Sequence, residues 1–185
     1  MRCIVYVLMV AASTTTGFTT LQLAKLAGLR VICIADVARH GAKLLDLGAD
    51  LLVDRHDPER AVQIIQGVTN NNLRYAIDIV GKETATQLQR TLTADGAHLL
   101  GYTGLPKEDR KDNVTYHTVP IKLFHTSPTV GEQTVCWLEK LLEKQLLTLP
   151  EIVQAQGGLG GINAALEILR SGSVSGKRMV VDLSS

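Results

Sequence analysis

The chain has 185 residues, of which 45% are hydrophobic, enough to bury one core of ordinary domain size. Its 19 basic and 18 acidic residues are spread along the chain, which argues against a nucleic-acid or membrane partner and favours a small molecule or a protein. The 3 cysteines are widely separated and fit neither a disulfide framework nor paired zinc ligands. We therefore expect a reduced, cytoplasmic protein.

Residues 3–12 form an apolar run that allows two interpretations. After Met1 and Arg2, such a run resembles a secretory signal, although it is too short to span a bilayer. It also fits a buried parallel strand. Because strand and helix patterns alternate after it, we favour the strand.

Elements are predicted along the whole chain from the hydrophobic period and the helix-capping signals. In order, these are strand 3–10, a helix across 17–28, strand 30–35, helix 37–47, strand 51–53, a helix starting at Pro58, strand 75–80, helix 84–93, strand 97–101, a strand from Val114 to Leu123, helix 130–144, a glycine-rich turn at 157–161, a helix, and strand 177–183. The charged segment 105–113 is expected to be a surface loop, and Trp137, Leu138, Leu141 and Leu142 to form the apolar side of helix 130–144.

The alternation of buried strands with helices predicts the α/β class, with a doubly wound parallel sheet in a Rossmann-like, three-layer αβα arrangement. We assign residues 1–150 to this nucleotide-binding type of domain. Residues 151–185 add a C-terminal helix and strand.

The loop after the first strand is a candidate phosphate site. A dinucleotide fingerprint uses three glycines, and here Ala11, Thr14 and Gly17 take their places. The hydroxyls of residues 13–16 (Ser13, Thr14, Thr15 and Thr16) stand at a predicted helix N-terminus, where they can bind a phosphate. The same hydroxyls can simply cap the helix, and the motif alone does not decide between these roles.

Asp36 follows the second strand, 19 residues beyond Gly17, close to the spacing at which an acidic side chain binds the adenosine ribose. A carboxylate there favours NAD over NADP. Arg39 and His40 are close by and could bind the 2′-phosphate of NADP instead, so the cofactor preference stays open. Asp36 could also be the N-cap of the helix that starts at Val37.

Several runs together resemble the cofactor-binding half of the medium-chain dehydrogenase/reductase superfamily. They are "ASTTTGFTTLQLAKLAG", "LGADLLVDRHD", "NNLRYAIDIVG", "HLLGYTGLP", "TVPIKLFH" and "GGLGGINAALEILRSGSVSGKRMVV". The resemblance covers nearly the whole chain in order, and the nearest branch is the fungal zinc-independent enoyl-reductase and quinone-reductase-like proteins of secondary metabolism.

The resemblance implies the positions of the site residues. Ser13 to Gly17 would lie on the pyrophosphate, and Asp36 and Arg39 at the ribose. Val80 and Gly81 would lie on the adenine side of the cleft. Gly101, Tyr102, Thr103, Phe124 and His125 would lie near the nicotinamide of NAD or NADP.

In the family, a GroES-like domain precedes this region and supplies most substrate contacts. Because the chain begins at Met1 just before the first predicted strand, we expect that domain to be absent. The C-terminal segment would then pack on the Rossmann core, pair with another chain or hang loose. Family members often dimerise through the edge strand, here from Val114 to Leu123, so a homodimer is expected.

Candidate catalytic groups are those near the carboxyl ends of the strands. Tyr102 and His125 could act as general acid and base, with Asp78 or His98 orienting them. Each also has an ordinary structural interpretation, as a hydrogen-bonded strand residue or a pocket wall. The histidines show no metal-ligand spacing with a cysteine, so no zinc site is predicted.

Three functions remain open. The first is an NAD(P)-dependent oxidoreductase, or the cofactor domain of one, acting on a small polyketide-like or enone substrate. The second is a redox-neutral cyclase or isomerase that uses the vacated cleft. The third is a non-catalytic dimeric binding module.

Overall fold

The computed structural model describes residues 5–120 and 122–183. Its first part contains β1 (Tyr6–Val10), α1 (Thr15–Leu26), β2 (Arg30–Ala35), α2 (Val37–Asp46), β3 (Leu51–Asp54), α3 (Pro58–Val68), β4 (Tyr75–Asp78), α4 (Lys82–Leu88), the 3₁₀ turn η1 (Gln89–Thr91), β5 (Ala97–Gly101) and β6 (Val114–Thr118). Its second part contains α5 (Leu123–Thr126), α6 (Pro128–Glu143), β7 (Ile152–Ala155), the 3₁₀ turn η2 (Gly158–Gly161), α7 (Ile162–Arg170) and β8 (Arg178–Val181). The predicted start of the first strand, at Cys3, lies outside the described residues.

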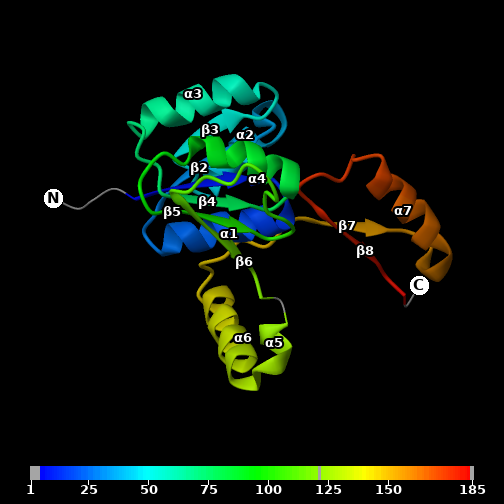
Figure 1. Cartoon of the computed structure of the whole chain (residues 1–185). Helices are drawn as coiled ribbons and strands as arrows, with labels where there is room; N and C mark the ends of the chain where they lie inside the picture. The colour runs from blue at the N-terminus through cyan, green and yellow to red at the C-terminus, as the bar shows by residue number, and fades with distance from the viewer. Residues whose placement is uncertain (1–4, 121, 184–185) are drawn as a thin grey trace.

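The first part is a 6-stranded sheet of order β3-β2-β1-β4-β5-β6 in which every neighbouring pair is parallel (Figure 1). In register, Leu8 of β1 lies opposite Ile32 of β2 and Ala76 of β4. These side chains pack with α3 and α4 in one core, while Met9 and its neighbours pack with α1 and α2 in a second core on the other face. The prediction of a doubly wound Rossmann-like α/β fold is confirmed.

Local sequence signals account for three helix starts. Thr14, Asp36 and Asp57 are the N-caps of α1, α2 and α3, and each side chain accepts a hydrogen bond from a backbone N–H three residues further on. Pro58 occupies the first turn of α3, where a missing N–H has no cost. These caps place the three helix N-termini at the carboxyl edge of the sheet.

One predicted strand extends too far, and one strand was not predicted. The strand expected from Val114 to Leu123 ends at Thr118, and Leu123 begins the short helix α5, while residue 121 lies outside the described part. Pro120 has no N–H to donate to a sheet, which limits that strand. The strand β7 was not predicted, although it pairs in parallel with β8 in a separate 2-stranded sheet.

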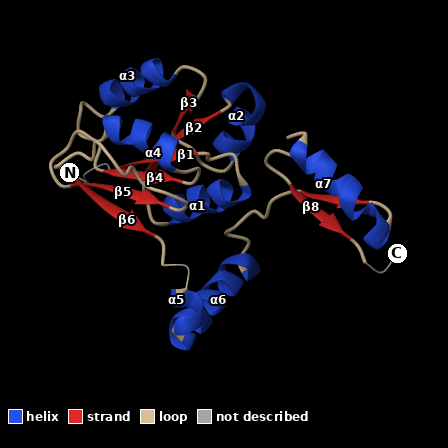
Figure 2. Ribbon diagram, turned by 45° about the vertical axis from the view of Figure 1, so that its right-hand side comes forward, coloured by secondary structure: helices blue, strands red, loops and turns tan. Residues whose placement is uncertain are grey.

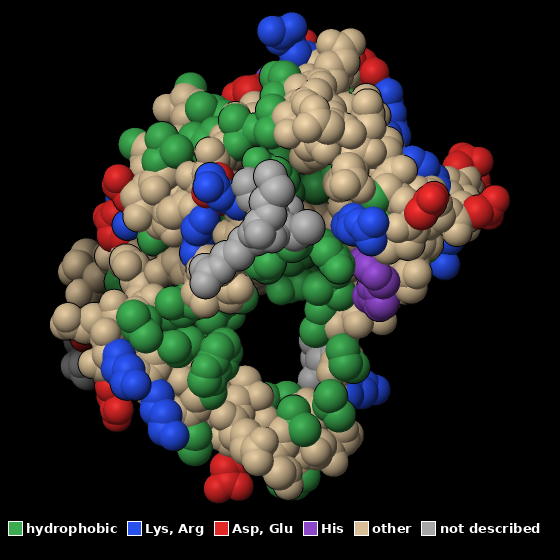
Figure 3. Space-filling view, turned by 90° about the vertical axis from the view of Figure 1, so that its left-hand side faces the viewer, with side chains coloured by type: hydrophobic (Ala, Val, Ile, Leu, Met, Phe, Trp, Pro, Cys, Tyr) green, Lys and Arg blue, Asp and Glu red, His purple; other side chains and the backbone are tan. Residues whose placement is uncertain are grey.

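Helices α5 and α6 project away from the six-stranded sheet as an arm, and the β7–α7–β8 unit stands apart on another side (Figure 2). Trp137, expected on the apolar side of α6, is 49% exposed, and Phe124 of α5 is 46% exposed. Hydrophobic side chains surround the opening between the arm and the rest of the chain (Figure 3). The apolar side predicted for helix 130–144 is therefore largely exposed in this structure.

The C-terminal turn, defined here as residues 171–176, joins α7 to β8 and contacts α1 and α2. Of the alternatives for the C-terminal segment, the structure shows packing on the Rossmann core at this turn. No helix in the described part of the chain combines the length and apolar character needed to cross a membrane.

Candidate nucleotide-binding site

A pocket of about 430 Å³ opens at the carboxyl ends of β1 and β2. Val10, Ala11 and Ser13 form its floor, and α3 and α4 contribute side walls that include Ile65 and Leu88. In a sheet of this strand order, ligands bind at the carboxyl edge where the order reverses, here between β1 and β4. The volume lies in the range of small-molecule sites, and the largely apolar walls suit a planar base.

The loop between β1 and α1 depends on Gly17. A Cβ at this position would lie 2.4 Å from the carbonyl oxygen of Ala11 and 2.6 Å from that of Ala12, so only glycine allows the helix to approach the strand this closely. Ala11 has φ +58°, a left-handed conformation that glycine would adopt without strain. The loop thus keeps the geometry of a glycine-rich turn although most of its glycines are replaced.

The four hydroxyl residues of this loop have different roles. Thr14 Oγ1 accepts from the N–H of Gly17 (3.0 Å) and donates to the carbonyl of Ala11 (3.0 Å), so this hydroxyl caps the helix. Ser13 and Thr14 line the pocket, whereas Thr15 and Thr16 lie in the first turn of α1. Thr14 thus takes the capping role, one of the two alternatives left by the sequence, and phosphate binding by Ser13 stays a prediction.

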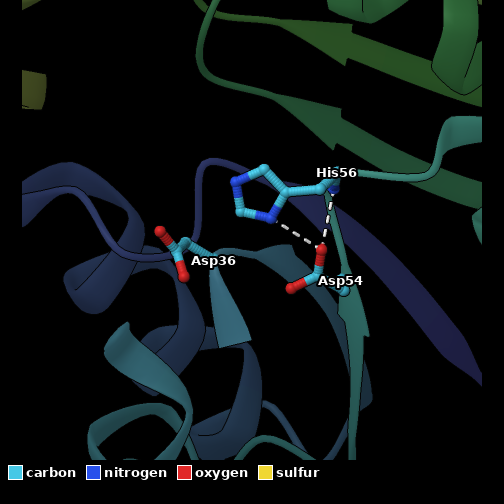
Figure 4. A group of neighbouring side chains, drawn as sticks. All are labelled: Asp36, Asp54 and His56. Atoms are coloured by element: carbon cyan, nitrogen blue, oxygen red, sulfur yellow. Dashed lines mark hydrogen bonds and ion pairs between the residues drawn. The ribbon is translucent and has the colours of Figure 1, made fainter. Parts of the chain in front are cut away.

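Asp36, Asp54 and His56 form a cluster at the ends of β2 and β3 (Figure 4). Asp54 Oδ1 accepts from the backbone N–H of His56 and lies 2.8 Å from its Nδ1, while Asp54 Oδ2 accepts from the N–H of Val37. The hydrogen bond from the His56 N–H is the main reason that the pKa of Asp54 lies below its usual value. One polar side-chain atom from each of Asp36, Asp54 and His56 lies within 4.8 Å of the other two. The hydrogen bonds at the start of α2 and in the turn after β3 account for this arrangement.

Asp36 is the N-cap of α2, since its Oδ1 accepts from the N–H of Arg39 (3.2 Å). Its other oxygen lies 3.9 Å from the guanidinium of Arg55. The cap expected as an alternative role is present, and it places the carboxylate at the end of β2, beside the pocket-lining Ala35.

Arg55 was not predicted as a site residue, yet it lines both the main pocket and an adjoining hollow of about 400 Å³. Arg39 lines this hollow too, and Ser175 of the C-terminal turn lines both spaces. Burial, followed by the charge of Arg39, lowers the pKa of the neighbouring His40, which favours the neutral form of its imidazole. Arg55 directly follows a strand that ends at the carboxyl edge, which is the signal that could have identified it.

The turn after β4 forms another side of the site. Asp78 is fully buried, and its Oδ1 accepts from the N–H groups of Val80 (3.0 Å) and Gly81 (2.7 Å). Burial raises the pKa of this carboxyl, against the smaller opposing effect of its polar neighbours. Val80 lines the pocket, and Thr103 donates to its carbonyl (2.6 Å), which ties the turns after β4 and β5 together.

Gly101 ends β5, where a Cβ would lie 2.4 Å from the carbonyl oxygen of Gly104. The hydroxyl of Tyr102 lies 3.4 Å from Thr20 Oγ1 of α1. Tyr102 is therefore held between the end of the sheet and α1, in the region where the resemblance implies the nicotinamide.

Phe124 and His125 lie on α5, with their rings in an edge contact 5.2 Å apart. Within the described residues no hydrogen bond joins His125 to Tyr102, so their pairing as acid and base stays a prediction. His98 Nδ1 lies 2.9 Å from Nε2 of His117 on the next strand, which is the structural role considered for it.

Comparison with known proteins agrees with this geometry. The family model described as zinc-binding dehydrogenase matches residues 15–127. Among solved structures, a putative NADPH:quinone reductase from Bacillus thuringiensis superposes with a TM-score of 0.83 at 20% identity, over 97% of this chain and 56% of that one. At this identity the superposition supports the fold.

Two fungal relatives match almost the whole chain. Trans-enoyl reductase BOA5 of Botryotinia fuckeliana is 31% identical over 96% of this chain and 52% of its own length. The enoyl reductase component lovC of the lovastatin nonaketide synthase, from Aspergillus terreus, is 30% identical over 97% of this chain and 54% of its own. The chain thus spans about half the length of these relatives.

Proposed function

The chain belongs to the zinc-binding dehydrogenase family, as the cofactor-binding half of a medium-chain dehydrogenase/reductase, and from this premise we propose that it binds NADPH for the reduction of an enoyl, polyketide-type substrate. The observation that carries the proposal is the pocket of about 430 Å³ between the hydroxyl-rich loop at the start of α1 and helices α3 and α4. Its apolar walls fit an adenine ring, and the free N–H groups at the start of α1 fit a pyrophosphate.

The charges around the ribose position favour NADPH over NADH. Asp36 is the one acidic candidate that the resemblance places there, and its carboxylate is already engaged by the N–H of Arg39 and by Arg55. Arg39 and Arg55 both line the adjoining hollow. An arginine beside the ribose accommodates the 2′-phosphate, because its planar donors match phosphate oxygens.

The proposed substrate class comes from the two fungal relatives, which are enoyl reductases. When bound, a reduced nicotinamide cofactor supplies the hydride that reduces a carbon–carbon double bond. On this chain, Gly101 and Thr103 would position the nicotinamide end, and Tyr102 and His125 are our candidates for moving a proton. The bond between the Tyr102 and Thr20 hydroxyls would fix the tyrosine ring at this position.

Calorimetric titration of the purified chain with NADPH and NADH tests the proposal. We expect NADPH to bind about tenfold more tightly, the ratio given by one additional charge-assisted contact. Arg55→Gln should remove most of this preference and leave NADH binding unchanged. Arg74→Gln is the matched control, since this exposed arginine precedes β4 at the opposite edge of the sheet.

The outcomes separate the parts of the proposal. A folded chain that binds neither nucleotide refutes the cofactor assignment, and equal binding of both refutes the preference. Consumption of NADPH with a trans-2-enoyl thioester then tests the reaction.

We also propose a homodimer through β6. This strand lies at the edge of the described sheet and pairs with β5 alone, so its other side can pair with a second chain. Sedimentation velocity of the chain checks the oligomeric state.

A further inference from the structure

The C-terminal turn is fastened to α2 by side-chain hydrogen bonds. The guanidinium of Arg39 donates to the carbonyl oxygens of Gly172 (3.1 Å) and Ser173 (3.2 Å). The hydroxyl of Ser175 lies 3.0 Å from Nε2 of His40. More than 130 residues of sequence separate the members of each pair, so the fold alone brings them together.

The same turn packs directly on two rings of the core. Gly176 has φ +78°, and a Cβ at this position would lie 3.4 Å from both Cε1 of His40 and Cζ of Phe18. A Cβ here would already touch both rings, so a longer side chain such as leucine would have to push the turn away from them. Gly172 in the same turn has φ +71°, but a Cβ there would meet nothing within 4 Å.

The turn is also a wall of the site. Ser175 lines both the main pocket and the adjoining hollow, and Arg55 is the other residue that lines both. Among the described residues, no hydrogen bond engages the N–H groups of Ser175 and Gly176. A phosphate group in the hollow would meet Ser175 of the turn together with Arg39 and Arg55, which line the same space.

We propose that the C-terminal turn closes the nucleotide pocket and that nucleotide binding tightens its attachment to α2, so that an occupied pocket holds the β7–α7–β8 unit in place. This inference rests on the proposed function, because it takes NADPH as the ligand of the pocket. The physical basis is that the ligand would contact the turn and the Rossmann core at once, and so favours the state in which the two are attached.

Hydrogen exchange of the full chain, followed by mass spectrometry with and without saturating NADPH, tests the attachment. Amides of the turn and of β8 should exchange about tenfold more slowly with NADPH, as local opening becomes less frequent. Protection of the β1–α1 loop without any change in the turn overturns the inference and leaves the proposed function intact. No protection at either place, with no calorimetric binding, overturns both.

A pair of variants tests the contact itself. Gly176→Leu should displace the turn from His40 and Phe18 and weaken NADPH binding about tenfold. Gly28→Leu has the same φ of +78° but open space, at a position that lines neither the pocket nor the hollow, so it should change the affinity less than about twofold. Equal effects of the two variants, in proteins with native circular dichroism, contradict the proposed role of the turn.

Discussion

Replacement of Gly17 by alanine is the sharpest test of how β1 and α1 form the site. The new Cβ would lie 2.4 Å from the carbonyl oxygen of Ala11, 2.6 Å from that of Ala12 and 2.7 Å from the Ala12 carbonyl carbon. All three are backbone atoms, so no side-chain rotation relieves the overlap and the loop itself must move. Inserting one methyl group into such a tight contact costs about 3 kcal/mol.

Alanine also gains in helix propensity over glycine, by about 1 kcal/mol inside a helix. Gly17→Ala should therefore lower the free energy of unfolding by about 2 kcal/mol, the difference between these two effects. Gly67 provides the matched control, because it lies in α3 at a position where a Cβ would meet nothing within 4 Å. Gly67→Ala should raise the free energy of unfolding by about 0.5–1 kcal/mol.

Urea unfolding followed by far-ultraviolet circular dichroism gives both values on the same scale. NADPH titration of the folded Gly17→Ala chain should in addition show weaker binding, because the displaced loop carries Ser13 and the start of α1. If Gly17→Ala is as stable as the wild type, or gains stability as Gly67→Ala does, the close approach of strand and helix is not as described.

Ala11→Gly should raise the free energy of unfolding by about 0.5–1 kcal/mol by relieving the left-handed backbone strain, and an unchanged urea midpoint would contradict this. Asp50→Asn should lower it by about 1–2 kcal/mol, because Asp50 accepts hydrogen bonds from Lys25 Nζ (2.6 Å) and from the Val31 N–H (2.8 Å) while only 17% of its side chain is exposed. Burial alone raises the pKa of Asp50, but these hydrogen bonds and the basic charges outweigh it and bring the pKa below its usual value. The contribution of Asp50 is thus fully present above about pH 4 and is lost as the pH falls through the lower, folded-state pKa, so the stability of the Asn variant should depend less on pH in acid. Burial, followed by the charge of Asp50, raises the pKa of the Cys33 thiol to about 12. Maleimide should therefore label the exposed Cys136 in the native protein and the buried Cys33 only after denaturation. Peptide mass mapping identifies the labelled cysteine, and labelling of native Cys33 would contradict its burial.

Local sequence determined most of the secondary structure. The bounds of β2 and β5 agree with the prediction, because each is a short buried run between turn residues. Capping residues fixed the starts of α2 and α3, with Asp36 and Asp57 immediately before the first helical residue. Such signals act over three or four residues and are visible in a single sequence.

The loop before Gly17, a candidate from its spacing after the first strand, and Val80, whose position the resemblance implied, both line the pocket at the carboxyl edge; that they bind a nucleotide stays a prediction. The prediction from the sequence extended β6 too far and missed β7. A four-residue strand such as β7 forms only when a partner, here β8, lies beside it. Periodicity showed that α6 is amphipathic, but whether its apolar side is covered depends on neighbours that periodicity does not contain.

The sequence by itself thus determined the Rossmann-like class, the order of elements and the phosphate-loop candidate. Only the tertiary structure decided that Arg55 and Ser175 line one pocket, and that Arg39 holds a turn 133 residues further along the chain. The physical reason is the range of the interactions. Helix propensity and capping depend on neighbouring residues, whereas a pocket wall depends on side chains that meet only after the sheet has formed and the chain has returned to it.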